Sequence, residues 1–197
     1  MEKKLDNFYT YYAQLSQISL RGKLYKRYFM APLLYRNAKK FGKVIVEIGS
    51  GIGSGLLGAY PKKIVGLEIN PYAVKHCQDQ GLTVELIDVN QPYPIDNDSV
   101  DVCVLDNVIE HISDANPSIN EFLRITRKNG GLIVAVPGVK GYASDDDHKV
   151  FYDESTLRNL HPEWSMLYCF STPFIIKSNW LSKYIRQYCL VAVYRKK

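Results

Sequence analysis

The chain lacks the features that would place it in a membrane or carry it through one. No apolar run reaches about 18 residues, the shortest length that crosses a bilayer as a helix. Residues 1–7 are too polar for a secretory signal. We therefore expect a cytoplasmic protein without a membrane span.

Cysteine is also scarce, and its positions exclude common metal and disulfide frameworks. None of the four cysteines lies in a CxxC pair or in a Cys/His spacing that suits zinc. They are Cys77, Cys103, Cys169 and Cys189. Because Cys103 falls inside an apolar run, we expect buried, reduced thiols.

Acidic residues are nearly absent from the start of the chain. Residues 1–43 hold ten Lys and Arg but two acids, a net charge of +8, whereas the remaining residues carry −3. Hydrophobic spacing predicts two helices here, around Leu5–Ile18 and Lys23–Lys39. We interpret residues 1–42 as a helical basic arm that caps the acceptor over a core of residues 43–197. A solvated helical face, a clamp for an anionic substrate and a contact with a membrane surface all fit this composition.

The most informative stretch is a buried strand, Val44–Ile48, followed by the glycine-dense turn Gly49–Gly55. A short helix is predicted at Leu56–Tyr60, and a second apolar run, Ile64–Leu67, ends in Glu68. A strand, a glycine turn and a helix N-terminus, with a carboxylate at the next strand tip, form a nucleoside-binding crevice. Glycine lets the backbone approach a ligand closely, and Glu68 is placed to accept ribose hydroxyls.

Strands and helices alternate along the rest of the chain, which predicts an α/β fold with a doubly wound, mostly parallel sheet. Asn-Pro pairs at Asn70-Pro71 and Asn116-Pro117 predict helix starts, and Asp153 predicts a third. The further predicted strands are Leu82–Ile87, Val100–Leu105, Leu132–Val136, Ser165–Phe170 and Tyr188–Tyr194.

Polar residues collect where successive predicted strands end. Because ligands bind outside the carboxyl ends of strands in such folds, this clustering predicts a ligand site. The residues are Glu47 to Gly53 after the first strand, Glu68 after the second, Asp88 after the third, and Asp106 and Asn107 after the fourth.

These segments resemble the motifs of class I S-adenosylmethionine-dependent methyltransferases. The similarity spans about residues 43–137 and is closest to the type 11, ubiquinone-biosynthesis-like group, with a weaker likeness to enzymes that modify sugars or polysaccharides. Its segments are Glu47–Gly53, Gly66–Asn70, Leu86–Val89, Leu105–Ile112, Glu121–Ile125 and Lys128–Leu132. Asn129 stands where the family usually has proline, which should alter the turn more than the chemistry.

The resemblance implies a three-layer α-β-α, Rossmann-like fold. Its sheet would have seven strands in the order 3-2-1-4-5-7-6, with the last strand antiparallel. The implied cofactor is S-adenosylmethionine, and the product is S-adenosylhomocysteine.

The resemblance also implies a role for each site residue. Gly49, Ser50, Gly51 and Gly53 would form the turn under the methionine part of the cofactor. Glu47 would hold the ammonium, and Glu68 the ribose. Ile69 and Val89 would enclose the adenine, and Asp88 would accept from its amino group. Asp106 and Asn107 would line the methionine side.

Two histidines are candidates for catalysis, because a hydroxyl acceptor needs a general base and imidazole titrates near neutrality. His111 follows the fourth strand closely, and His148 lies in the loop that receives the acceptor in this family. Three acids beside it, Asp145 to Asp147, are placed to orient His148 or to bind an ion.

The local group of Asp106, Glu110 and His111 also bears on metal binding. Two ligands on one helical turn do not complete a site, so we predict no metal.

Tyrosines together with Arg and Lys in the arm and loops favour a small, sugar or lipid-linked hydroxyl acceptor. The sequence makes no prediction about the oligomer.

Three other functions remain open. Gly53–Gly58 matches GxGxxG, which alone is a weak indication of a nicotinamide-dependent oxidoreductase. A non-catalytic module that binds the cofactor or a partner is a second possibility. A nucleic-acid methyltransferase is a third, although the proline-rich motif that commonly holds a flipped base is absent at Asp106–Ile109.

Overall fold

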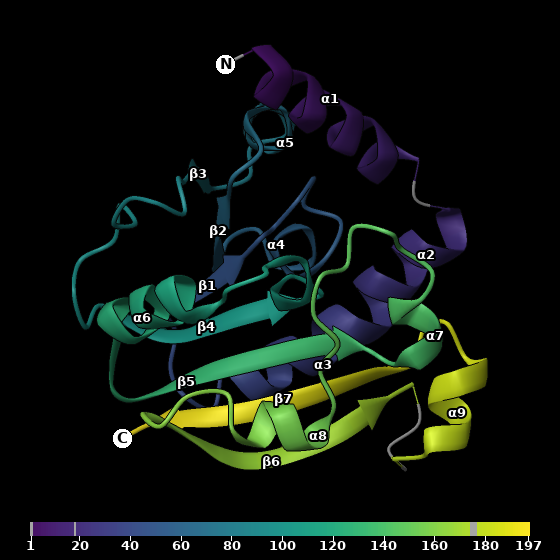
Figure 1. Cartoon of the computed structure of the whole chain (residues 1–197). Coiled ribbons are helices and arrows are strands. Elements are labelled where there is room, and N and C mark those ends of the chain that lie inside the picture. Colours follow the sequence, from purple (N-terminus) through teal and green to yellow (C-terminus); the bar gives the residue numbers. More distant parts are fainter. Residues whose placement is uncertain (1, 18, 174–176) are drawn as a thin grey trace.

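Seven strands form one twisted sheet in this computed structural model, which describes residues 2–17, 19–173 and 177–197 (Figure 1). The strands are β1 (Ile45–Ile48), β2 (Ile64–Glu68), β3 (Val84–Leu86), β4 (Val100–Asp106), β5 (Thr126–Pro137), β6 (Trp164–Thr172) and β7 (Cys189–Lys196). Their order is β3-β2-β1-β4-β5-β7-β6, and β7 pairs antiparallel with both of its neighbours. The expected topology is confirmed.

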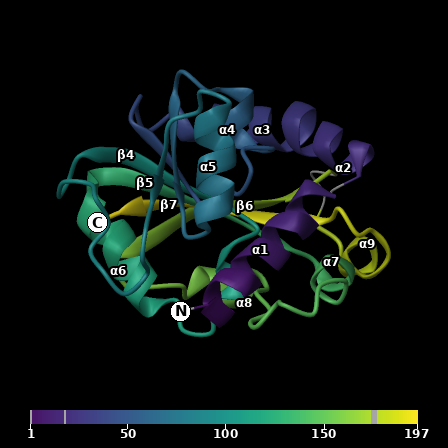
Figure 2. The same cartoon turned by 90° about the horizontal axis from the view of Figure 1, so that it is seen from above.

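Helices cover both faces of the sheet and complete three layers (Figures 1 and 2). One face carries α3 (Ala31–Ala38), α4 (Leu56–Ala59) and α5 (Pro71–Asp79), and the other carries α6 (Asn116–Ile125) and α8 (Glu154–Arg158). Neighbouring β4 residues divide between the two cores: Val102 packs in the first and Cys103 in the second. This alternation follows from the two-residue side-chain period of a strand.

The basic arm is one short helix followed by a longer, nearly continuous one. α1 (Glu2–Ser16) lies across the carboxyl ends of the first strands, beside α5 (Figure 2). α2 (Leu20–Tyr25), a π-helical turn η1 (Lys26–Met30) and α3 then follow without a break. Ser19 starts α2 by accepting a hydrogen bond from the Gly22 N–H. Residue 18, the predicted end of the first helix, lies outside the described residues.

Two predicted helix starts are capped as the sequence indicates. The Asn70 side-chain oxygen accepts from the backbone N–H groups of Tyr72 and Ala73 at the start of α5. Asp153 and Thr156 form a reciprocal capping box at the start of α8. Among the described helices, none is long and apolar enough to pass through a bilayer.

Some elements differ from the predictions. β5 begins at Thr126 rather than Leu132, because the turn at Asn129 becomes an irregularity within the strand, with Asn129 in the left-handed region at φ 61°. Three short helices were not predicted, since they are too short for a helical period to be visible. They are η2 (Ile109–His111), α7 (Val139–Tyr142) and α9 (Asn179–Tyr184).

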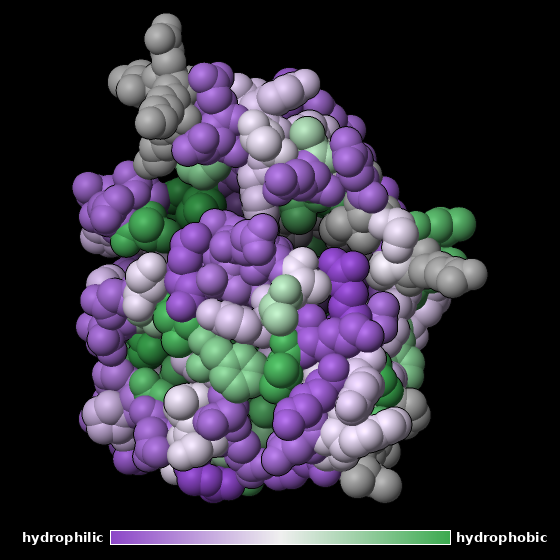
Figure 3. Space-filling model, turned by 45° about the vertical axis from the view of Figure 1, so that its right-hand side comes forward, coloured by the Kyte–Doolittle hydropathy of each residue, from purple (hydrophilic) through white to green (hydrophobic). Residues whose placement is uncertain are grey.

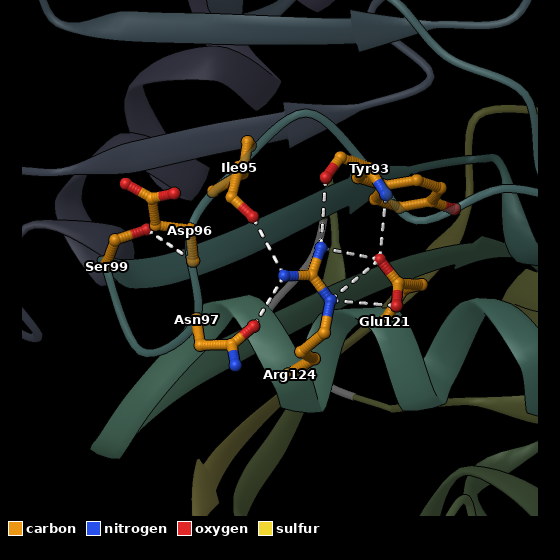
Figure 4. Close-up of polar contacts among 7 residues, drawn as sticks. All are labelled: Tyr93, Ile95, Asp96, Asn97, Ser99, Glu121 and Arg124. Carbon is orange, nitrogen blue, oxygen red and sulfur yellow. Dashed lines mark hydrogen bonds and ion pairs between the residues drawn. The ribbon is translucent and has the colours of Figure 1, made fainter.

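Arg124, a half-buried residue of α6, holds the loop between β3 and β4 against that helix. Arg124 donates to the carbonyl oxygens of Tyr93 and Ile95, at 3.0 and 2.9 Å, and to the Asn97 side chain at 2.7 Å (Figure 4). The Glu121 carboxylate accepts from Arg124 and from the Tyr93 N–H. Because the contacts of Arg124 use the planar guanidinium fork, a lysine cannot reproduce them.

We expect Arg124→Lys to lower the free energy of unfolding by about 1–3 kcal/mol, measured by urea denaturation, because charged hydrogen bonds to the loop are lost. Arg158→Lys is the matched control, since Arg158 makes an exposed pair with Glu154 on one helix face. That exchange should change stability by less than about 0.5 kcal/mol. Equal effects of the two exchanges would show that the fork does not hold the loop.

Candidate active site

A cleft of about 570 Å³ opens across the carboxyl ends of β1, β2 and β4. Its floor is the glycine turn, and its walls come from α1, from the loop after β3 and from the residues that follow β4. On the face drawn in Figure 3, a recess with hydrophobic surface opens between hydrophilic parts of the chain. The volume is within the range of sites for small ligands and cofactors.

The glycine turn forms the floor of this cleft because its backbone excludes side chains. Gly49 and Gly51 have φ values of 68° and 54°, a region that favours glycine. A Cβ on Gly49 would lie 2.6 Å from Val108, whereas one on Gly51 would face Leu15 of α1 at 3.6 Å. The backbone at Gly51 is therefore open to the cleft and is covered by α1.

Two other residues of the turn, Gly53 and Ser50, pack against the elements behind it. A Cβ on Gly53 would lie 2.6 Å from Leu82, which places Gly53 beneath the α5 side of the turn. The buried Ser50 hydroxyl lies against Gly66 of β2 and has no hydrogen-bond partner. Gly53 therefore supports the turn from behind, whereas Ser50 is buried at the lining of the cleft.

Glu68, at the tip of β2, is buried and ties three backbone groups together. One oxygen accepts from the Gly51 N–H at 2.7 Å, and the other accepts from the Ile69 and Asn70 N–H groups at 2.8 and 2.9 Å. Burial raises the pKa of Glu68, and the three hydrogen bonds oppose that shift. A carboxylate has about four acceptor sites, so one site remains for a ligand hydroxyl.

Two further acids and one lysine meet at the start of α4. Glu47 accepts from the N–H groups of Leu56 and Leu57, at 3.3 and 2.7 Å. Burial raises the pKa of Glu47 to about 8. Asp106, at the tip of β4, has its Oδ2 atom 3.9 Å from the Lys26 ammonium of η1. All three side chains line the cleft.

Asn107 is held in a left-handed conformation, with φ 57°. Its side-chain amide donates to Asp106 Oδ1 at 2.7 Å, and it lines the cleft beside Val108. Asparagine tolerates this backbone region better than most residues, which explains the residue type. The sharp turn at Asn107 directs the chain into η2.

The residues predicted around the adenine divide into two groups. Ile69 and Val89 line the cleft, and each is 43% exposed, so both offer an uncovered apolar surface. Asp88, in contrast, is exposed and accepts from the backbone and side-chain N–H groups of Asn90. The buried Tyr93 completes this wall, and the sequence did not single it out.

The structure brings the two predicted histidines together. The rings of His111 and His148 lie 4.6 Å apart, centroid to centroid, although 37 positions separate them in the chain. Burial, followed by the proximity of His148, lowers the pKa of His111, so its imidazole is neutral at pH 7. Asp147 Oδ2 lies 3.5 Å from His111 Nδ1, and the two side chains line the cleft.

The sequence indicates a capping role for the arm, but it does not identify the residues of α1 that line the cleft. Residues of one face of this helix line the cleft: Asn7, Phe8, Thr10, Tyr11, Gln14 and Leu15. Tyr9 and Tyr12 instead pack on Tyr72 of α5. The tyrosine content of the arm was visible in the sequence, but the face that turns toward the cleft was not.

The raised pKa of Glu47 predicts a pH-dependent stability. In the unfolded chain Glu47 ionises near its ordinary value of 4.5, but in the folded chain it does so near 8. Between these values the folded state holds the extra proton, so stability falls as the pH rises. Between pH 4.5 and 8, the free energy of unfolding should decrease with pH less steeply in Glu47→Gln than in the unaltered chain, by about 1.4 kcal/mol per pH unit. Glu163→Gln, an exposed exchange, is the control, and identical slopes in both variants would contradict the assignment.

Most of the residues that line the cleft lie within a known domain. Residues 46–134 match the family model described as "Methyltransferase domain". A protein of Mycobacterium tuberculosis named "Probable S-adenosylmethionine-dependent methyltransferase" is 31% identical over 90 residues. A similarly named protein of Mycolicibacterium smegmatis is 30% identical over 99 residues. The matches cover 45% and 49% of this chain, but 33% and 38% of those relatives.

Solved structures share the fold over nearly the whole chain. A structure of the Haloferax volcanii Trm112 methyltransferase activator with a methyltransferase superposes with a TM-score of 0.73 at 17% identity, covering 96% of this chain and 97% of that one. A SAM dependent methyltransferase of Archaeoglobus fulgidus gives 0.65 at 15%, covering 94% and 100%. The family match therefore places a methyltransferase domain at residues 46–134, and these solved structures share the fold and strand order in which it lies.

Proposed function

We propose that this chain transfers a methyl group from S-adenosylmethionine to a hydroxyl group of an acceptor carried on an anionic lipid surface. The observation that supports the transfer most directly is the charge pattern of the cleft. Glu47 and Asp106 lie beside Lys26, and Glu68 occupies the neighbouring strand tip. Two acids and a cation are complementary to the ammonium and the carboxylate of an amino-acid head group.

The remaining walls match the other parts of the cofactor. Glu68 retains one acceptor site for a ribose hydroxyl, and the apolar side chains of Ile69 and Val89 are placed to enclose the adenine. The open backbone at Gly51 allows close approach of the chain that joins the ribose to the sulfonium. We assign no contact to Gly53 beyond support of the turn, and Asp88, which accepts from Asn90, does not line the cleft.

The catalytic residues in this proposal are His111 and His148. His111 lines the cleft beyond Asn107, on the side where the cofactor would place its methyl group, and the His148 ring lies 4.6 Å from it, centroid to centroid, outside the lining of the cleft. Methyl transfer to oxygen requires removal of the hydroxyl proton, and a neutral imidazole such as that of His111 can accept it. The chemistry itself is an in-line displacement that depends on positioning.

The acceptor class is inferred from the end of the molecule where α2 and α9 lie (Figures 1 and 2). Residues 7–46 and 164–197, which supply these helices, contain no Asp or Glu. The Tyr25 hydroxyl of α2 donates to the Gln187 carbonyl, which joins the two segments. A surface with cations and no acids attracts anionic partners.

The same end of the molecule exposes large apolar side chains at helical spacing. Leu20, Leu24 and Tyr28 follow one another every four residues and are 72%, 47% and 70% exposed. On α9, the tilted rings of Trp180 and Tyr184 lie 5.0 Å apart, centroid to centroid, and both side chains are more than half exposed. Aromatic and aliphatic side chains beside Lys and Arg are typical of surfaces that rest on a bilayer.

The four free cysteines suit a reducing compartment, the cytoplasm.

Isothermal titration with S-adenosylmethionine tests the cofactor assignment. We expect saturable binding that weakens about 10- to 100-fold in Glu68→Gln, because a charged hydrogen bond to the ribose is lost. Glu85→Gln, on the exposed side of β3, should bind as the unaltered chain does. Binding of NADH in place of S-adenosylmethionine would instead favour an oxidoreductase.

Co-sedimentation with vesicles tests the acceptor surface. We expect the chain to bind phosphatidylglycerol vesicles at low salt and not phosphatidylcholine vesicles. Replacing Leu24 and Trp180 together by serine should weaken binding at least about tenfold, since apolar insertion is lost. Leu86→Ser, at an exposed position of β3, is the control. Failure to bind either vesicle, or tighter binding to RNA that weakens steeply with salt, would contradict a lipid-borne acceptor.

A further inference from the structure

The loop after α7 is fastened directly onto the short helix η2 that follows β4. The backbone N–H groups of Lys149 and Val150 both donate to the carbonyl oxygen of Glu110, at 2.7 and 3.0 Å. This double contact brings His148 against Glu110 and His111. The three side chains therefore form one cluster, and backbone hydrogen bonds between the two segments hold it together.

Glu110 is the anomalous member of this cluster. Its side chain is 0% exposed, and neither carboxylate oxygen has a hydrogen-bond partner. A buried carboxylate without hydrogen bonds is strongly destabilised unless a cation or a proton compensates it. The Nε2 atom of His148 lies 3.9 Å from Glu110 Oε1. At that separation no hydrogen bond joins the two atoms.

His148 is oriented as a metal ligand would be. Its Nδ1 atom lies 2.7 Å from the carbonyl oxygen of Tyr142, which can only accept, so Nδ1 carries the proton. The Tyr142 ring also stacks on the imidazole, 5.1 Å away between centroids. In a neutral ring the Nε2 lone pair then faces Glu110. A backbone carbonyl that fixes the tautomer in this way is a common support of metal-binding histidines.

We propose that Glu110, His111 and His148 bind one divalent transition-metal ion. One ligand atom from each residue lies within 4.8 Å of the others. Ligand atoms around a bound Zn²⁺ are about 3.4 Å apart, so a small contraction would close the site. Two imidazoles and one carboxylate favour Zn²⁺, Mn²⁺ or Fe²⁺ over Mg²⁺ and Ca²⁺, which prefer oxygen ligands. Three protein ligands leave a position open toward the cleft, where His111 and Asp147 lie.

The role of the ion rests on the proposed function. The acceptor hydroxyl would bind at the open position, where the ion lowers its pKa and the proton passes to water. The oxygen then forms a bond to the methyl carbon as the bond from that carbon to sulfur breaks. The electron pair of the broken bond stays on sulfur, which yields S-adenosylhomocysteine. With the ion bound, His111 and His148 would hold it, and the ion would replace the His111 imidazole as the group that activates the hydroxyl.

Metal titration of the full chain, freed of metal by a chelator and without cofactor or acceptor, tests the site. We expect one equivalent of Mn²⁺ to bind, detected by loss of its free electron-paramagnetic-resonance signal, and Zn²⁺ to displace it. Glu110→Gln and His148→Ala should each weaken binding at least about tenfold. His161→Ala is the matched control, because His161 instead accepts from the Glu163 N–H.

The proposal is wrong if the unaltered chain shows no saturable binding up to about 1 mM Mn²⁺ or Zn²⁺, or if Glu110→Gln binds as tightly as the control. Circular dichroism establishes that each variant is folded, and His148→Gln replaces any variant that is not. The readout does not depend on methyl transfer. If the unaltered chain does not bind S-adenosylmethionine in the separate titration, the proposed function is wrong, but the metal-site proposal is unaffected.

Discussion

The carboxylate of Glu68 is the interaction on which the cleft depends. By accepting from Gly51 on one side and from Ile69 and Asn70 on the other, it joins the glycine turn to the tip of β2. Asn70 extends the connection, since its side chain caps α5 and donates to the carbonyl oxygen of Phe8 in α1. One buried acid therefore couples the floor of the cleft, one wall and the helix that covers it.

The electrostatics of the cleft follow from this crowding of acids at strand tips. Parallel strands end at one edge of the sheet, so residues that are far apart in sequence, Glu47, Glu68 and Asp106, enter the same crevice. Burial raises the pKa of Glu47 and Glu68, while Lys26 and the N–H groups at the start of α4 offset part of the cost. A site arranged in this way favours a cationic ligand, since the ligand supplies the missing positive charge.

Much of the fold could be predicted because its signals are local. The apolar runs of β1 and β2, the glycine turn and the Asn-Pro helix starts depend on neighbouring residues alone, and the structure places them as predicted. The start of β5 could not be predicted, because pairing between Thr126 and Val100 extends the strand across the Asn129 turn. The short helices η2, α7 and α9 are likewise set by what they pack against rather than by a helical period.

The sequence by itself determined the order of the elements, the positions of the acids at strand ends and the charge of the arm, since these depend on residue type and spacing. Only the tertiary structure decided which face of α1 turns toward the cleft and which ring nitrogen of His148 is free. It also brought His148 to Glu110, across 38 positions of chain. These arrangements arise from contacts between distant segments, and a linear pattern carries no information on such contacts unless the loops between them are short and regular.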